Sequence, residues 1–184
     1  MEPSQRLKVE TCDAHHRLEV SLSIDELFAT RASYAEFLRR LTGVQLPAEA
    51  TVSAWLDDRL FASETRAEWL RCDLQWLLDE QPRVDLADFD WVTSASYAAG
   101  VAYVLEGAAL GGRVLRQQAQ QRLRFVDENG VRFFSGHGEA TMTRWQQVRI
   151  WLDHNLCDND QVDTATEAAR RTFQIFQAAL EGGL

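Results

Sequence analysis

The stretch "YVLEGAALGGRVL", residues 103–115, decides how the fold of this chain is understood. Apolar residues in it and around it recur at helical spacing over about residues 94–122. The stretch nevertheless contains Gly107, Gly111 and Gly112, and a glycine inside a helix costs about 1 kcal/mol relative to alanine. Such glycines indicate that something approaches the helix backbone closely, either another helix or a ligand.

Apolar residues recur at helical spacing along nearly the whole chain. Further helices are predicted at residues 7–18, 34–41, 65–77, 143–155 and 163–180. Gly43 is expected to end the second of them. The single strand-like piece is "RFVDENGVRFF", residues 124–134, in which Asn129-Gly130 would make a tight turn. The sequence therefore predicts an all-α helical bundle that forms one domain over residues 1–184.

Charge and composition exclude several classes of protein. The net charge of −9 argues against a nucleic-acid-binding protein, which would carry a basic face. Three widely spaced cysteines fit reduced thiols in a cytoplasm better than a disulfide framework. The first ten residues lack the apolar core of a signal peptide, and the longest uncharged run, residues 91–105, is too short for a membrane span. We therefore expect a cytoplasmic protein without a membrane span.

The paired histidines near the N-terminus are the first candidates for chemistry, since the motifs GxxxxGK[ST], GxGxxG, HExxH and GxSxG are all absent from the sequence. His15 shares a helical face with Leu7 and Thr11. A histidine on such a face is more often a packed core residue, and the alternative is a ligand to a metal or haem iron. Lys8, the only lysine, lies two turns before His15, and this pair suits a flat apolar ligand with carboxylates at its rim. Cys12 and His16 have the spacing of half a zinc site, but no second pair follows.

Three blocks of the sequence resemble the bacterial haem oxygenases. The block "LKVETCDAHHRLE" resembles the start of that family, in which a Thr-x-x-x-His-x-x-Leu-(Glu/Asp) pattern carries the proximal histidine. The block "YVLEGAALGGRVL" resembles the distal helix, and "RFFSGHGEATMTRWQQV" resembles the segment after it. The blocks follow the order and spacing of the family over about residues 7–150. The resemblance implies a haem-oxygenase-like helical bundle.

In this family haem lies between a proximal helix, whose histidine ligates the iron, and a distal helix that crosses over the iron. The resemblance implies that His15 is the axial ligand of the haem iron. It also implies that Lys8 and Tyr103 contact the haem propionates, one by charge and one by its hydroxyl. Arg149 is a third candidate for such a contact.

The resemblance gives the glycines of the opening stretch a role on the distal side. Gly107 and Gly111 would let the helix backbone approach haem and dioxygen, where side chains would collide with them. Trp145 and Phe173 would line the site, and a plain core position is the alternative for both. The chain departs from the family at Ala108, where bacterial members often place a serine tied to distal water.

The implied activity is oxidative cleavage of haem to biliverdin, with release of carbon monoxide and ferrous iron. Haem would serve as substrate and cofactor, together with dioxygen and electrons from a reductase or ferredoxin. Docking of an electron-donor protein often uses complementary charge, which makes the acidity of this chain relevant. The alternative is a non-catalytic haem-binding or partner-binding protein on the same fold, which Ala108 favours. A further alternative is another enzyme with this bundle architecture that acts on a small heterocycle, but no motif in the sequence supports it.

Overall fold

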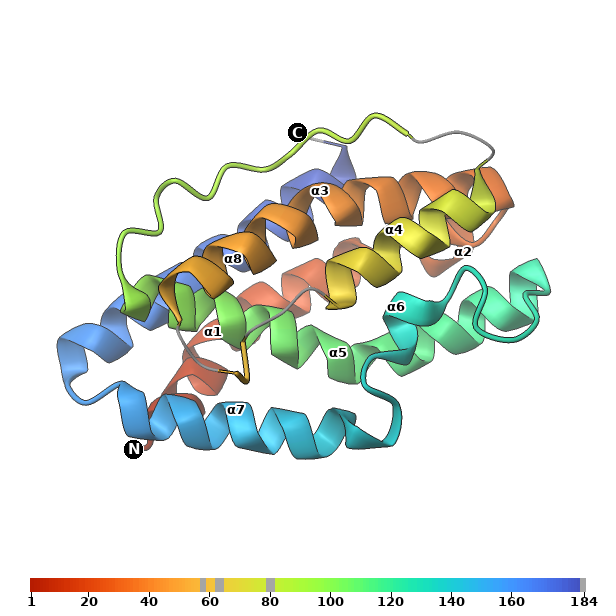
Figure 1. Ribbon diagram of the computed structural model, residues 1–184. Helices are drawn as coiled ribbons and strands as arrows, with labels where there is room; N and C mark the ends of the chain where they lie inside the picture. Colours follow the sequence, from red (N-terminus) through yellow and green to blue (C-terminus); the bar gives the residue numbers. More distant parts are fainter. Residues whose placement is uncertain (57–58, 62–64, 79–81, 183–184) are drawn as a thin grey trace.

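The chain folds into a bundle of helices (Figure 1), described here from a computed structural model in residues 1–56, 59–61, 65–78 and 82–182. No strand occurs in these residues. The helices are α1 (Pro3–Ser21), α2 (Ile24–Leu27), α3 (Arg31–Trp55), α4 (Thr65–Leu77), α5 (Ala95–Leu123), α6 (Arg132–Ser135), the 3-10 helix η1 (Gly138–Ala140), α7 (Thr141–Asn155) and α8 (Asn159–Glu181). The predicted all-α architecture is confirmed.

Polar residues just before the long helices account for where these helices begin. The Ser94 hydroxyl accepts a hydrogen bond from the Tyr97 N–H at the start of α5. The Asp158 carboxylate accepts a hydrogen bond of 2.8 Å from the Gln161 N–H at the start of α8. Such caps satisfy backbone N–H groups that have no partner within the helix. They fix the first turns of the two helices that form the centre of the bundle.

Helix α3 does not end at Gly43, as the sequence predicts, but continues through Gly43 and Pro47. Pro47 has no N–H to donate to the Gly43 carbonyl one turn earlier. The Ala87 N–H donates to that carbonyl instead, at 2.9 Å, because residues 82–93 run along α3 (Figure 1). A Cβ on Gly43 would lie 2.2 Å from the Asp85 carbonyl oxygen, so the glycine serves this close approach.

The predicted strand over residues 124–134 is wrong. The segment forms a turn after α5 and then the short helix α6. The turn itself is present, since Gly130 takes a φ of +77°, which glycine adopts without strain. Phe125, Phe133 and Phe134 are buried in the helical core, so the apolar pattern reflects packing rather than strand pairing.

Helix α5 is the central helix of the bundle and packs against α3, α6, α7 and α8. Residues 98–105 are all buried. Among the described residues, α5 is the one helix long and apolar enough to cross a membrane, but 61% of its most apolar window is buried inside the protein. Core helices of soluble proteins pass the same test. We therefore treat α5 as a core helix.

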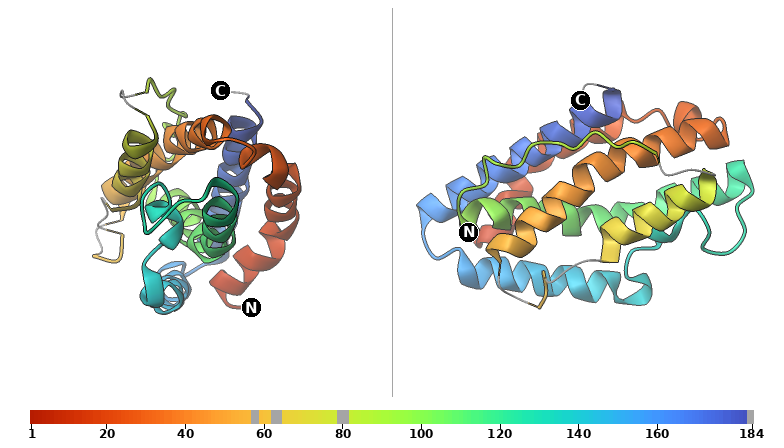
Figure 2. Two further views of the ribbon diagram at one scale, coloured as in Figure 1. Left: turned by 90° about the vertical axis from the view of Figure 1, so that its right-hand side faces the viewer. Right: turned by 45° about the horizontal axis from the view of Figure 1, so that its top comes forward.

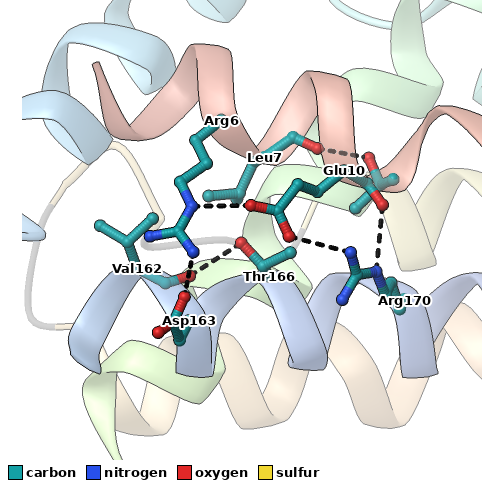
Figure 3. Close-up of polar contacts among 8 residues, drawn as sticks. Arg6, Leu7, Glu10, Val162, Asp163, Thr166 and Arg170 are labelled. Carbon is teal, nitrogen blue, oxygen red and sulfur yellow. Dashed lines mark hydrogen bonds and ion pairs between the residues drawn. The ribbon is translucent and has the colours of Figure 1, made fainter. Parts of the chain in front are cut away.

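Helix α1 is fastened to α8 by polar contacts (Figure 3). The Glu10 carboxylate accepts from the Arg6 Nε at 2.7 Å and from the Arg170 Nη2 at 2.9 Å. Arg6 also pairs with Asp163, and Arg170 Nε donates to the Glu10 carbonyl at 3.0 Å. Two arginines and two carboxylates thus hold α1 along α8, with Leu7 buried beneath them.

Candidate functional site

Two of the glycines in α5 serve helix packing. A Cβ on Gly100 would lie 2.0 Å from the Ala165 carbonyl oxygen of α8. A Cβ on Gly112 would lie 2.8 Å from the Phe134 carbonyl oxygen of α6. Both distances are far below van der Waals contact, so these positions admit glycine alone without movement of a neighbouring backbone. For this pair, the approaching group is another helix.

Gly107 and Gly111 have a different environment, because no neighbouring backbone presses on them. A Cβ on Gly111 would meet nothing within 4 Å, and one on Gly107 would make ordinary contact with the Trp145 ring at 3.5 Å. Leu110 is 37% exposed and Val114 is 61% exposed beside them. Helix α5 therefore has an open, apolar face at the glycines that the resemblance assigns to the distal side.

His15 has an imidazole suited to metal ligation. Its ring is exposed on α1, and its Nδ1 lies 3.5 Å from a carboxylate oxygen of Glu19, one turn later. A carboxylate at Nδ1 favours the tautomer that leaves Nε2 free to bind a metal. The Phe173 ring, from α8, packs perpendicular to the His15 ring, with the ring centroids 5.6 Å apart. The neighbouring His16 is also exposed.

Polar residues of α1, α5 and α7 meet at Tyr103. Burial raises the pKa of Tyr103, while a hydrogen bond with the Thr11 side chain and the positive charge of Arg149 oppose that rise. Tyr103 is 8% exposed, and its ring packs against Trp145 of α7. Lys8 lies one turn before Thr11 on α1 with an exposed side chain. The charge of Arg149 thus acts on Tyr103, and the contact of Tyr103 with Trp145 places α7 beside this part of α5.

Helices α1 and α5 form the two sides of this candidate site. In the left view of Figure 2, α1 (red) lies to one side of α5 (green), and α8 (blue) packs beside both. His15 and Lys8 belong to α1, whereas Tyr103, Gly107 and Gly111 belong to α5. Arg149 and Trp145 come from α7 and Phe173 from α8. No group of three or more histidine, cysteine or acidic side chains that could hold a metal occurs in the described residues.

A buried charged cluster behind α5 escapes the sequence analysis. The Glu106 carboxylate of α5 receives two hydrogen bonds from Arg144 of α7, at 2.7 and 2.8 Å. The Arg66 guanidinium is buried next to it and donates to the Leu105 carbonyl. These residues and Glu49 line a small cavity of about 20 Å³, which has room for a single water. A carboxylate in an apolar helix indicates a buried cationic partner, but the sequence does not show which arginine pairs with Glu106.

The fold and this site define an all-helical protein in which α1 carries an exposed imidazole and α5 has an open face at its glycines. The family model described as "Heme oxygenase" matches residues 1–182, and the chain belongs to this family. It is a haem-degrading enzyme, whose chemistry requires haem, oxygen and reducing electrons.

Relatives of known sequence and structure agree with this assignment. Over 182 residues the chain is 29% identical to "Heme oxygenase PigA" of Pseudomonas aeruginosa, covering 97% of this chain and 91% of the relative. The heme oxygenase structure from Neisseria meningitidis has a TM-score of 0.85 and 21% identity, over 100% of this chain and 92% of that chain. The heme oxygenase structure from Leptospira interrogans has a TM-score of 0.83 and 19% identity, over 98% of this chain and 99% of that chain. These likenesses confirm the haem-oxygenase-type bundle.

Proposed function

We propose that haem binds between α1 and the Gly107–Gly111 segment of α5, with His15 Nε2 as the axial ligand of the iron. The observation that carries this proposal is the contact of His15 Nδ1 with Glu19, which leaves Nε2 as the nitrogen for the metal. The open backbone at Gly111 supports a flat ligand on the opposite side. Phe173, packed perpendicular to the His15 ring, restricts rotation of the imidazole.

Lys8, Tyr103 and Arg149 are proposed to bind the two haem propionates. A carboxylate near these groups would receive charge-assisted hydrogen bonds from Lys8 and Arg149 and one from the Tyr103 hydroxyl. The Tyr103 side chain is buried and packs against Trp145 of α7, which restricts its ring and so the position of its hydroxyl. Propionates at this end would orient the macrocycle along α5 toward Gly111.

Bound haem would supply the redox centre, and its oxidation would yield biliverdin, carbon monoxide and ferrous iron. The role of the chain is then to position the macrocycle and restrict water on the distal side. Gly107 and Gly111 keep that side free of side chains, and Trp145 limits access beside Gly107. Ala108 offers no hydrogen bond, so polar contact there rests on backbone groups and water.

We also propose that residues 1–184 act as one domain in the cytoplasm and receive electrons from a reductase or a ferredoxin. A single continuous core that includes residues of α1, α3, α5, α7 and α8 supports the single domain. Three exposed, unbridged cysteines fit a reducing compartment. A donor protein with a basic docking face would be attracted by the net charge of −9.

The test compares two neighbouring histidines of α1. His15→Ala should abolish the histidine-ligated absorption spectrum of the one-to-one haem complex, whereas His16→Ala should leave it nearly intact. The matched control is therefore the adjacent, equally exposed imidazole. The opposite behaviour of the two variants would refute His15 as the ligand. Haemin, a reducing system and air should convert the wild-type complex to a bilin band; a stable haem band would indicate a protein that only binds haem.

A further inference from the structure

Two arginines from different helices form hydrogen bonds with α5 immediately before Gly107. Arg66 of α4 donates from Nη1 to the Leu105 carbonyl at 2.5 Å. Arg144 of α7 donates from Nε and Nη2 to the two oxygens of the Glu106 carboxylate, and it also donates to the Leu60 carbonyl. The contacts fall on successive residues of α5, so the helix is held from two directions at one turn.

The contacts with Arg144 have a geometry that fixes orientation. A guanidinium that meets a carboxylate with two parallel hydrogen bonds permits little rotation of either group. The side chains of Glu106 and Arg144 are 11% and 22% exposed, so water competes weakly for them. Glu106 in turn raises the pKa of Arg144, most strongly through its hydrogen bonds, which keeps Arg144 charged.

Arg66 of α4 contacts the same turn of α5 and lines the same small cavity as Arg144. Its guanidinium lies 4.6 Å from the centre of the Phe133 ring, and the residue is 4% exposed. Burial lowers the pKa of Arg66, and the charges of Glu106 and Glu49 oppose that effect. Burying charges in this way is seldom favourable for stability alone, since apolar residues of similar volume do as well. A role in positioning is therefore worth testing.

The part of α5 that follows this turn has less support of its own. Residues 98–105 are all buried, whereas Ala108, Leu110 and Gly111 are exposed. Three glycines between residues 107 and 112 also lower the intrinsic stability of the helix there. This open segment is held at its start by the Leu105–Glu106 turn and at its end by the packing of Gly112 against α6, so a shift of that turn would move Gly107 and the residues next to it.

We propose that Arg144, acting through Glu106, is a positioning residue that sets how close Gly107 and Gly111 lie to the haem, with Arg66 holding the same turn. The inference rests on the haem placement proposed above. It assigns Arg144 no contact with haem. Its effect is on the local order of α5 and on which side of the macrocycle is presented for oxidation.

The experiment uses Arg144→Lys, which keeps the charge but loses the two-pronged contact, and Arg144→Gln combined with Glu106→Gln, which removes both charges of this pair together and leaves Glu49 as the carboxylate near Arg66. In the haem-free protein, amide hydrogen exchange at residues 107–112 should accelerate at least about tenfold relative to residues 98–105. In the haem-loaded protein, the mixture of biliverdin isomers should broaden and the C–O stretch of the carbon monoxide complex should shift. Arg122→Gln is the matched control, because it removes an exposed arginine–carboxylate pair at the far end of α5 and should change none of these.

Unchanged exchange at residues 107–112 with an unchanged isomer mixture would overturn the proposal. So would faster exchange that is uniform along α5 with unchanged isomers, because Arg144 would then serve stability alone. Failure of the haem placement itself has a separate signature. His15→Ala would then keep its histidine-ligated spectrum, whatever Arg144→Lys does to the exchange.

Discussion

Lys8 stands on α1 one turn before Thr11, with its ammonium group in solvent. A solvent-exposed charge contributes little binding energy, because water screens it, but it still favours one orientation of a carboxylate ligand. The contribution of Lys8 should therefore appear in how haem is oriented rather than in how tightly it binds. Tyr103, which is buried, should matter more for affinity than Lys8.

We predict that Lys8→Ala weakens haem binding by less than about fivefold, consistent with an exposed charge pair worth at most about 1 kcal/mol. The same variant should broaden the mixture of biliverdin isomers, because one propionate loses its cation. Chromatography of the bilin products and a haem titration measure the two effects. An isomer mixture identical to that of the wild type would remove Lys8 from the site.

At the scale of the element, α5 contains glycines with opposite roles. Gly100 lies against the backbone of α8, whereas Gly111 faces open space. The sequence shows both as glycines in one apolar helix and does not distinguish them. Their roles depend on which neighbour each meets, and that is set by the packing of the whole bundle.

We predict that Gly111→Ala leaves the haem-free protein as stable as the wild type or more stable by up to about 1 kcal/mol, because alanine is the better helix former. Haem degradation should nevertheless fall severely, since the added methyl group enters the proposed distal space. Gly100→Ala should instead lower the free energy of unfolding by about 1–3 kcal/mol or more, because its methyl group meets backbone atoms. Thermal unfolding and bilin yield give the two measurements. A strongly destabilised Gly111→Ala with intact turnover would show that Gly111 serves packing.

The junction between α4 and α6 depends on a buried carboxylate. The two oxygens of Asp73 accept the backbone N–H groups of Arg132 and Phe133, at 3.0 and 2.9 Å, at the start of α6. Burial nevertheless raises the pKa of Asp73 from 3.8 to about 6. The folded protein therefore binds a proton at Asp73 more tightly than the unfolded chain does.

We predict a pH dependence of stability that Asp73→Asn removes. Because the folded pKa is the higher one, the contribution of Asp73 is greatest below pH 4 and declines as the pH rises to about 6, above which it is constant. The decline amounts to about 2–3 kcal/mol in the free energy of unfolding, at about 1.4 kcal/mol per pKa unit. Denaturant titrations of both proteins at pH 4, 5, 6 and 7 measure the difference in slope. Parallel curves would contradict the raised pKa.

Much of this architecture is local in origin, and the sequence analysis predicts that part. The cap at Ser94 and the helical periodicity after it depend on neighbours along the chain, whereas α8 begins at Asn159, before the predicted start at residue 163. Other errors fall where a distant segment intervenes. Gly43 ends a helix in most local contexts, but here the 82–93 segment supplies the hydrogen bond that Pro47 cannot.

The candidate site divides in the same way. His15, Lys8 and the glycines of α5 are predicted from the sequence because their motifs are contiguous, and their roles at a haem site stay predictions. The Arg144–Glu106 pair is not found, since its partners lie 38 residues apart on different helices. Glu19 lies within the N-terminal motif, yet its contact with His15 Nδ1 becomes visible only in the folded helix.

At the scale of the whole molecule, the placement of α1 depends on α8. Glu10 binds Arg6 and Arg170, and Arg6 reaches Asp163 (Figure 3). All four side chains are partly exposed, so their attraction is sensitive to salt. The position of His15, which also packs against α8 through Phe173, is thereby coupled to the ion pairs between α1 and α8.

We predict that Glu10→Gln lowers the melting temperature by about 2–4 °C at low salt, because two surface ion pairs are weakened. In about 1 M NaCl the difference should shrink by more than half, since the screening length falls to about 3 Å. Glu167→Gln, an exposed carboxylate on α8, is the control for the change in net charge. A difference that persists in high salt would show that Glu10 acts through packing.

The pairing of α1 with α8 also has a consequence for how the protein is made. Helix α1 leaves the ribosome first, but the residues that hold it, and the Phe173 ring beside His15, belong to α8. At about 5–20 residues per second, translation of the chain between residues 21 and 159 takes about 7–30 s. During that interval α1 lacks its contacts with α8. On the haem placement proposed above, we expect capture of haem to follow completion of α8 rather than to accompany synthesis of α1.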